Sequence, residues 1–317
     1  MKVVLPGGTG QVGTLLARSF HARGDEVVVL GRSPSRAPWR TVRWDGVTIG
    51  EWARELDGAD VVINLAGRSV NCRYTPENRR QIMDSRVIST RVVGAAIAKS
   101  PRPPRLWLQA STATIYAHRL DAPNDEATGI IGGDEPGAPS TWRFSIAVAK
   151  AWEQVAQEAA TPHTRLVLMR SAMIMSPDRG GIFDTLLRLV RFGLGGPAGG
   201  GRQYVSWLHD ADFIRAVDWL IAHEELAGPV NLASPNPLPY GAFMGALRRA
   251  WGMPVGLPAT RWMVEIGAFV LRTESELALK SRRVVPGLLL QSGFTFQWPT
   301  WPEAAQDLCR RWRRGAA

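Results

Sequence analysis

Cysteine and lysine are scarce in this chain of 317 residues. Only Cys72 and Cys309 carry thiols, which excludes a disulfide framework and a cysteine-rich metal site, so we expect a reducing compartment and two buried structural thiols. Of the 38 basic residues, four are lysines and 34 are arginines, so an arginine is informative only through its position. The five histidines lack metal-ligand spacing, and no metal site is expected.

Long apolar runs are also missing. No run approaches the roughly 20 residues that a membrane-spanning helix needs. Met1 is followed at once by an apolar run and a glycine turn, which leaves no room for a secretory signal. We therefore expect a cytoplasmic protein without a membrane partner. The 45% hydrophobic content and the absence of repeats exclude disordered, fibrous and repeat proteins.

Acidic residues are outnumbered, and the formal net charge is +10. Such a surplus permits phosphates, nucleic acid or anionic lipid as partners and does not choose among them. The arginines that end the amphipathic segment 301–314 suit a helix C-terminus, where the dipole favours cations. A nucleic-acid protein would interleave basic residues with exposed aromatic residues. We expect no specific nucleic-acid partner, and generic electrostatic binding would be lost at modest salt.

Short apolar runs alternate with helix-period stretches over the first half of the chain, a pattern typical of an α/β, Rossmann-type, doubly wound parallel sheet. The predicted strands cover residues 3–5, 26–30, 60–65, 105–110, 165–169 and 229–233. The predicted helices cover residues 11–23, 76–98, 141–160 and 210–223, and helices dominate after residue 239. We predict a nucleotide-binding domain from 1–172 plus 206–234, and a smaller, mainly helical substrate domain from 173–205 plus 235–317. The glycine-rich stretches 193–197 and 199–201 are predicted loops on the substrate side.

The sharpest motif is Gly7-Gly8-Thr9-Gly10-Gln11-Val12-Gly13, which follows the first predicted strand and opens a helix. Glycines are needed here because the turn uses backbone angles that a Cβ disfavours and because the backbone must approach a pyrophosphate closely. The pyrophosphate then lies on the helix N-terminus, where free N–H groups and the dipole favour an anion. The motif predicts a dinucleotide site; the alternative is a plain tight turn.

The second predicted strand ends in Leu30-Gly31-Arg32-Ser33, and Arg36 follows. An NAD site would place a carboxylate here for the ribose 2′-hydroxyl, whereas an arginine pairs with the 2′-phosphate of NADP. We therefore expect NADP(H); the alternative is an ordinary surface arginine in an arginine-rich chain. The small residues of Asn64-Leu65-Ala66-Gly67, which follow the strand predicted at 60–65, let a cofactor lie across the strand ends.

Together with Ser111-Thr112-Ala113-Thr114-Ile115-Tyr116, these motifs resemble the extended short-chain dehydrogenase/reductase superfamily. More narrowly, the chain resembles its atypical, epimerase-like family (the NAD-dependent epimerase/dehydratase type) with a C-terminal domain of unknown function. The match also runs from residues 64–67 to residues 84–87, and it includes residues 193–197, 206–209, 228–232, 281–286 and 292–294. The resemblance also implies that His209 and Asp210 are structural hydrogen-bonding groups that join the domains.

The resemblance implies a catalytic tyrosine with a lysine four residues later, and a Ser/Thr that polarises the substrate oxygen. Lys150 occupies the lysine position, but the tyrosine position is Ile146, which cannot transfer a proton. Thr112 matches the Ser/Thr position, and Arg86 stands where a helix asparagine is usual. Tyr116, at the carboxyl edge of the sheet, is the predicted replacement acid. An equal alternative is that its ring only forms part of the pocket wall. The alternative interpretation of Lys150 is an ordinary lysine on a helix surface.

These arguments give three candidate catalytic residues, Thr112, Tyr116 and Lys150. The residues predicted to bind the cofactor are Gly7, Gly8, Thr9, Gly10, Gln11, Val12, Gly13, Arg32, Ser33, Arg36, Asn64, Leu65, Ala66, Gly67, Arg86, Ser111 and Lys150. The leading hypothesis is an NADP-dependent, oxidoreductase or epimerase-like enzyme for a small carbonyl or alcohol substrate, working as a monomer or homodimer. The alternative is an NADP(H)-binding sensor or scaffold without turnover, which the missing tyrosine keeps open.

Overall fold

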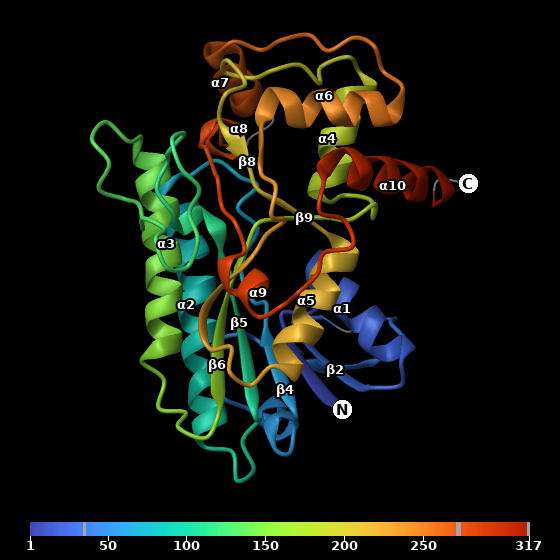
Figure 1. The fold of residues 1–317 in the computed structure, drawn as a ribbon. Coiled ribbons are helices and arrows are strands. Elements are labelled where there is room, and N and C mark those ends of the chain that lie inside the picture. The colour runs from blue at the N-terminus through green and yellow to red at the C-terminus, as the bar shows by residue number, and fades with distance from the viewer. Residues whose placement is uncertain (34–35, 271–273, 316–317) are drawn as a thin grey trace.

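The computed structural model describes residues 1–33, 36–270 and 274–315, and its centre is a parallel sheet of seven strands in the order β10-β6-β5-β4-β1-β2-β3 (Figure 1). In chain order these strands are β1 (Lys2–Pro6), β2 (Glu26–Gly31), β3 (Arg40–Arg43), β4 (Val61–Asn64), β5 (Leu106–Thr112), β6 (Arg165–Ser171) and β10 (Gly228–Leu232). The chain reverses its direction of travel across the sheet between β1 and β4. Doubly wound sheets bind ligands beyond the strand ends at such a switch point.

Helices cover both faces of the sheet. Val3 and Leu5 of β1 face the core beneath α1 (Gln11–Ala22) and α5 (Asp210–Ala222). Val4, between them, faces the core beneath the helices α2 (Pro76–Ala98) and α3 (Ser140–Gln157), which lie side by side in Figure 1. Burial on both faces explains why these strands are continuous apolar runs rather than alternating ones.

Beyond the carboxyl ends of the strands lies a smaller, mainly helical region with a core of its own, drawn at the top of Figure 1. At its centre Phe243 stacks on Trp301, and the ring of Trp207 packs against Trp301 at a tilt. Its helices are α4 (Ile182–Arg191), α6 (Tyr240–Trp251), α7 (Arg261–Val270), α8 (Glu276–Leu279) and α10 (Trp301–Arg314). Its short strands are β7 (Met173–Met175), β8 (Tyr204–Val205), β9 (Trp207–His209) and β11 (Leu238–Pro239). The 3-10 turns η1 (Glu51–Leu56) and η2 (Ala113–Ile115) and the short helix α9 (Gly287–Gln291) complete the described elements.

The predicted fold class is confirmed, and most elements coincide with their predicted ranges to within a few residues. Strand β3 was not predicted, because Arg40–Arg43 is short, carries an arginine at each end and lies at the sheet edge. The prediction that both thiols are buried was wrong for Cys72, which is only half-buried. Among the described residues, no helix combines the length and apolar character needed to cross a bilayer.

The proposed division of the chain into 1–172 plus 206–234 and 173–205 plus 235–317 stays a prediction. One detail bears on it: Leu289 of α9 and Phe294, both from the second set, are buried in the core between the sheet, α1 and α5. The C-terminal segment therefore crosses back onto the part built around the seven-stranded sheet before it forms α10.

Candidate functional site

The glycine turn after β1 divides into positions that must be small for packing and one that faces open space. A Cβ on Gly7, whose φ is +73°, would lie 2.6 Å from the backbone of Ala66, and a Cβ on Gly13 would lie 2.4 Å from Cα of Gly8. A Cβ on Gly10, in contrast, would meet nothing closer than the Gly7 carbonyl oxygen at 3.9 Å. Gly10 therefore leaves room for a ligand at the backbone.

The N-terminus of α1 has the features of an anion-binding site. Gly10 is its N-cap and supplies no side chain to the free N–H groups, and the first turn carries no acidic residue. The amide nitrogen Nε2 of Gln11 is buried and has no hydrogen-bond partner among the described residues. That amide packs against Gly181, where an added Cβ would lie 2.0 Å from it, so the anion site is formed by the backbone N–H groups, and these fit the pyrophosphate of a dinucleotide.

A cavity of about 640 Å³ lies beside the turn. The residues that line it are Gly8, Thr9, Thr14, Arg18, Val29, Arg32, Ser33, Arg36, Ala37, Pro38 and Trp39. It thus brings together the predicted residues Arg32, Ser33 and Arg36. Arg18 was missed by the sequence analysis, although it lies two turns along α1 from the turn; it also forms an ion pair with Asp178 at 3.5 Å.

The loop after β4 is shaped by Asn64, which is fully buried. Its Nδ2 donates to Oε1 of Gln109 at 2.9 Å, and its Oδ1 accepts from the backbone N–H of Ala66 at 3.1 Å. These bonds hold Ala66 against Gly7, so Asn64 positions the cofactor-side loop while its own amide is occupied by protein groups. The backbone N–H of Leu65 donates to the Pro6 carbonyl at 2.8 Å and ties the two loops together.

Arg86 of α2 lies against this loop. A Cβ on Gly67 would be 3.2 Å from the guanidinium carbon of Arg86, and that guanidinium stands 5.0 Å from the ring of Trp152. Its Nη1 donates to the Ile82 carbonyl at 3.0 Å, and within the described part of the chain it pairs with no carboxylate. Burial lowers the pKa of Arg86 to about 10. The group remains a cation next to the strand ends.

Ser111 and Tyr116 belong to a buried polar network behind the carboxyl edge of β5 and β6. The hydroxyl of Ser111 donates to Glu153 at 2.5 Å, and Arg170 donates to both oxygens of Glu153, at 2.8 and 2.7 Å. The hydroxyl of Tyr116 donates to Oδ1 of Asn231 at 2.9 Å and accepts from Arg170 at 3.0 Å. Burial raises the pKa of Tyr116. We refer to Ser111, Tyr116, Glu153, Arg170 and Asn231 as the Arg170 network.

Two of the remaining superfamily positions, Ile146 and Lys150, meet at Gly133, where an added Cβ would lie 3.3 Å from each side chain. Thr112 is half-buried, and its hydroxyl accepts from the backbone N–H of Thr114 at 3.2 Å. Ile146 is buried, and a Cβ on Gly132 would lie 2.9 Å from its Cδ1, so this side chain is covered by the loop around Gly132. Lys150 is exposed beside Gly133, and none of its contacts within the described residues reaches Thr112 or the glycine turn.

A second polar group, which we call the Tyr74 cluster, consists of Tyr74, Thr114, Ser145, Glu276, Lys280 and Arg282. Ser145 donates to Glu276 at 2.6 Å, and the Tyr74 hydroxyl lies 3.4 Å from the Ser145 hydroxyl. Arg282 donates to the Thr114 hydroxyl at 3.0 Å, and Lys280 donates to the Thr114 carbonyl at 2.6 Å. The cluster therefore joins η2 and α3 of the nucleotide-binding part to the segment around α8.

Burial controls the protonation of the Tyr74 cluster. It raises the pKa of Tyr74 to about 12, raises that of Glu276, and lowers that of Lys280 to about 7. The sequence analysis missed this cluster because its members are far apart along the chain. The only signal was scarcity: Tyr74 is one of four tyrosines, and Lys280 is one of four lysines.

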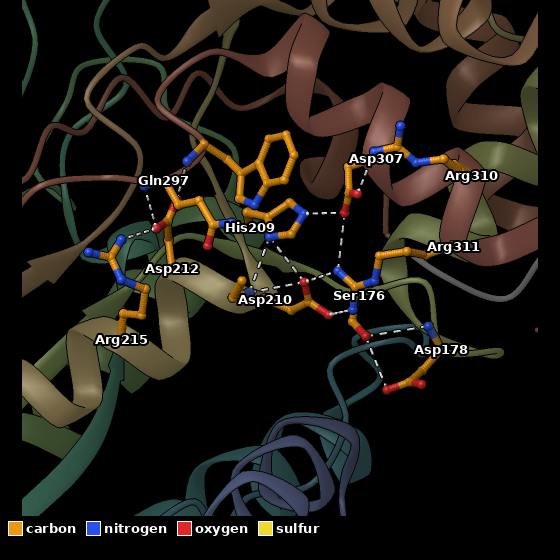
Figure 2. Close-up of polar contacts among 12 residues, drawn as sticks. Ser176, Asp178, His209, Asp210, Asp212, Arg215, Gln297, Asp307, Arg310 and Arg311 are labelled. Carbon is orange, nitrogen blue, oxygen red and sulfur yellow. Dashed lines mark hydrogen bonds and ion pairs between the residues drawn. The ribbon is translucent and has the colours of Figure 1, made fainter.

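His209 and Asp210 connect α5 to the C-terminal helix, as Figure 2 shows. His209 caps α5 by accepting from the Ala211 N–H at 3.1 Å, and its Nε2 lies 3.3 Å from Asp307 of α10. Arg311 binds both oxygens of Asp210, at 2.8 and 2.7 Å. Burial lowers the pKa of His209. Because these groups satisfy one another, their geometry is that of a structural tie between two helices.

The comparisons with known proteins agree with this architecture. Residues 3–233 match the sequence model of the NAD dependent epimerase/dehydratase family, and residues 259–308 match a domain of unknown function, DUF1731. Among curated proteins, "Epimerase family protein SDR39U1" of Bos taurus is 31% identical over 312 residues, which cover 97% of this chain and 99% of that protein. "Epimerase family protein SA0724" of Staphylococcus aureus (strain N315) is 28% identical, with coverage of 97% and 98%.

Two solved structures extend the likeness to three dimensions. Human epimerase family protein SDR39U1 (isoform 2), solved with NADPH, has a TM-score of 0.85 and 27% identity, covering 98% of this chain and 99% of that one. The nucleoside-diphosphate sugar epimerase from Corynebacterium glutamicum has a TM-score of 0.75 and 26% identity, covering 97% of this chain and 58% of that one. The predicted resemblance is confirmed: this chain belongs to the NAD dependent epimerase/dehydratase family and carries the C-terminal domain DUF1731.

Proposed function

We propose that the protein is an NADP(H)-dependent oxidoreductase or epimerase-like enzyme for a small carbonyl or alcohol substrate. The observation that carries the proposal is the cavity beside the glycine turn, which Arg18, Arg32 and Arg36 line and to which no described residue adds a carboxylate. A 2′-phosphate needs such cations, whereas a site for NAD would offer an acid to the ribose. The NADPH in the human structural neighbour supports the same choice.

When bound, the cofactor would supply or accept hydride at the substrate carbon. The chain's own residues then divide the remaining work. The start of α1 binds the pyrophosphate, and Arg32 with Arg36 binds the 2′-phosphate. Arg86 offers a cation beside Gly67, where it can stabilise negative charge near the strand ends. The Thr112 hydroxyl orients the substrate oxygen, and Lys150 stays the proposed partner of the ribose.

The proton donor is the open element of this proposal, because Ile146 replaces the usual tyrosine. Tyr116 remains our first candidate, although its hydroxyl is engaged by Asn231 and Arg170 and its ring is 2% exposed. The Tyr74 cluster offers a second phenol, whose hydroxyl lies 3.4 Å from the Ser145 hydroxyl, and Ser145 in turn donates to Glu276 at 2.6 Å. Two phenols thus compete for one role.

The second candidate function is an NADP(H)-binding sensor or scaffold without turnover. A specific observation favours it: Ile146 is sealed beneath the loop around Gly132, and Lys150 is exposed beside Gly133. In this alternative the cavity and the glycine turn keep their roles, while the strand ends carry no proton chemistry.

Single-turnover absorbance of bound NADPH tests the proposal. The purified protein is loaded with NADPH and mixed with aldehydes, ketones, quinones and nucleotide sugars, and the decay is compared with the uncatalysed rate. If Tyr116 is the acid, Tyr116→Phe slows the decay by roughly 10² to 10⁴ with little change in NADPH affinity, whereas Tyr74→Phe does not. The reverse pattern assigns the role to Tyr74.

Two further outcomes complete the test. If a water held by Thr112 and Lys150 donates the proton, both phenylalanine variants are mild and Lys150→Met weakens cofactor binding and turnover together. Silence across the whole panel, with NADPH binding intact, contradicts turnover and leaves the sensor. Failure to bind NADPH at all contradicts both functions.

A further inference from the structure

Helix α7 presents its large apolar side chains to solvent. Trp262, Ile266 and Phe269 follow the spacing i, i+4, i+7 and are 63%, 55% and 70% exposed, while Ala268, on another face, is buried. Surface helices normally turn such residues inward. The outward apolar face of α7 therefore needs an explanation outside the described fold.

Two loops that are hydrogen-bonded to each other just before α7 also expose large apolar side chains. Phe192 and Leu194 follow α4, and Val255 with Leu257 follows α6; all four side chains are exposed. Backbone hydrogen bonds hold the loops together, from Leu257 N–H to the Gly193 carbonyl at 2.8 Å and from Ala259 N–H to the Pro197 carbonyl at 2.9 Å. We call Phe192, Leu194, Val255, Leu257, Trp262, Met263, Ile266 and Phe269 the apolar surface. Exposed patches of this kind mark interaction sites.

Arginines lie close in sequence to the residues of the apolar surface. Arg191 precedes Phe192, Arg248 and Arg249 end α6, and Arg261 begins α7. Within the described part of the chain, none of the four forms an ion pair with a carboxylate. Over residues 188–202 and 248–269, Glu265 is the only acidic residue in the sequence. The surface therefore combines bulky apolar side chains with a local excess of positive charge.

This charge decides between the occupants. A second copy of the chain, related by twofold symmetry, would bring the arginines of one copy toward those of the other, and like charges oppose such an interface. A bilayer with anionic headgroups attracts the arginines and accepts Trp, Phe, Ile and Leu side chains at the boundary between headgroups and acyl chains. We propose that the apolar surface docks peripherally on an anionic lipid bilayer.

The proposal concerns contact with one leaflet, and it departs from the expectation that the protein has no membrane partner. It is independent of turnover, but it has a geometric relation to the site. The guanidinium of Arg73 lies 5.8 Å from the ring of Phe269 and is paired with Glu274 at 3.4 Å. Glu274 in turn accepts from the backbone N–H of Tyr74 at 2.6 Å. A docked α7 therefore places the Tyr74 cluster near the bilayer.

Vesicle flotation with the full-length protein tests the proposal. Vesicles of phosphatidylcholine with phosphatidylglycerol are compared with vesicles of phosphatidylcholine alone. We expect about tenfold more bound protein on the anionic vesicles, and a decrease when salt is raised. The variant Trp262→Ser/Ile266→Ser/Phe269→Ser should lose about tenfold or more of this binding. The matched control is Val47→Ser/Ile130→Ser/Leu290→Ser, which removes exposed apolar groups elsewhere and should float like the wild type.

Thermal unfolding verifies that each variant is folded, and Phe192→Ser/Leu257→Ser replaces the α7 variant if that one is not. Equal flotation on neutral and anionic vesicles, no flotation of the wild type, or flotation that survives the serine substitutions would each overturn the proposal. Light scattering provides the remaining outcome. A wild-type dimer that becomes monomeric in the α7 variant would make the apolar surface a self-interface and would also overturn it.

Discussion

The carboxyl edge of the sheet has an open half and a buried half, and the two are built differently. At β1 and β2, the nucleotide cavity is made by residues 8–39, a single stretch of sequence, and it stays open. At β5, β6 and β10, the Arg170 network and the Tyr74 cluster fill the space with polar side chains drawn from distant segments. The open half has polar groups that await a ligand, whereas the groups of the buried half satisfy one another.

Because of this difference, the open half contributes to ligand binding and the buried half contributes to the stability of the fold. An unsatisfied donor, such as a free backbone N–H at the start of α1, contributes once a ligand arrives. A paired buried ion such as Arg170 contributes to the folded state itself, and removing its partner leaves an uncompensated charge. Substitutions in the open half should therefore change NADPH affinity at constant stability, and substitutions in the buried half should do the opposite.

Gly10→Val should have the largest effect. The new side chain enters the space at the backbone of the turn, where a Cβ meets no protein atom closer than 3.9 Å, so the protein should fold while NADPH binding is abolished. Calorimetric titration with NADPH and thermal unfolding measure the two properties. Gly50→Val is the control for generic damage by valine, because Gly50 lies outside the cavity lining, has an extended backbone with φ −142°, and would bring a Cβ no closer than 3.6 Å to the neighbouring ring of Trp52. Unchanged binding by folded Gly10→Val would mean that the motif is only a turn.

Arg170→Met should be next. It leaves Glu153 buried without its bidentate partner and removes a donor to Tyr116, and breaking such a pair costs about 3–5 kcal/mol of stability. Urea unfolding measures this loss, with the exposed Arg91→Met as the control. The fraction that stays folded should bind NADPH like the wild type. A stability loss no greater than that of the control contradicts the distinction between the two halves.

Lys280 should make stability depend on pH. Burial lowers its pKa to about 7, whereas an unfolded lysine keeps its proton to a pKa of about 10.4. Between these values the unfolded chain binds more protons, so this lysine destabilises the fold below pH 7 and the penalty fades as pH rises. From pH 7 to about pH 9 the free energy of unfolding should rise by about 2 kcal/mol relative to that of Lys280→Met. Lys99→Met, at an exposed site, should keep the wild-type slope, and parallel curves for wild type and Lys280→Met would contradict the effect.

Arg32→Ala should affect binding alone and leave the stability of the fold unchanged. A desolvated pair between an arginine and a phosphate is worth on the order of 1.5–3 kcal/mol, so NADPH affinity should fall by about tenfold or more while NADH affinity changes little. Calorimetry with both cofactors provides the measurement. Equal affinity of the wild type for NADPH and NADH would contradict the interpretation that Arg32, after the second strand, selects NADP(H). Retained preference in Arg32→Ala would transfer the role to Arg18 and Arg36.

The open half could be predicted because its information is local. The glycine turn, Arg32, Ser33 and Arg36 lie within a few residues of strand ends, where the backbone pattern fixes their position. Helix α2 was predicted at 76–98, its bounds in the structure, because Pro76 and the apolar spacing mark its start and its face. Arg18 was missed since its relevance depends on which face of α1 borders the cavity.

The buried half could not be predicted in the same way. Spacing placed Lys150 at the superfamily lysine position, but spacing does not report that the side chain is exposed. Ser111 was predicted to contact the cofactor, and its hydroxyl donates to Glu153, a partner 42 residues away in the chain. The Tyr74 cluster combines side chains from four separate segments, a meeting that only tertiary packing decides.

The position of β10 in the sheet bears on how the protein is made. β10 pairs with β6, but the chain reaches it only after passing through α4, β8, β9 and α5. A nascent chain that ends before Gly228 therefore exposes the backbone groups of β6 as an open edge, which can pair with another chain. The sheet face beneath α5 also stays partly uncovered until Leu289 and Phe294 have been made. The part built around the sheet is thus complete only once Phe294 has been made, and until then its open strand edge and uncovered apolar face can pair with other chains.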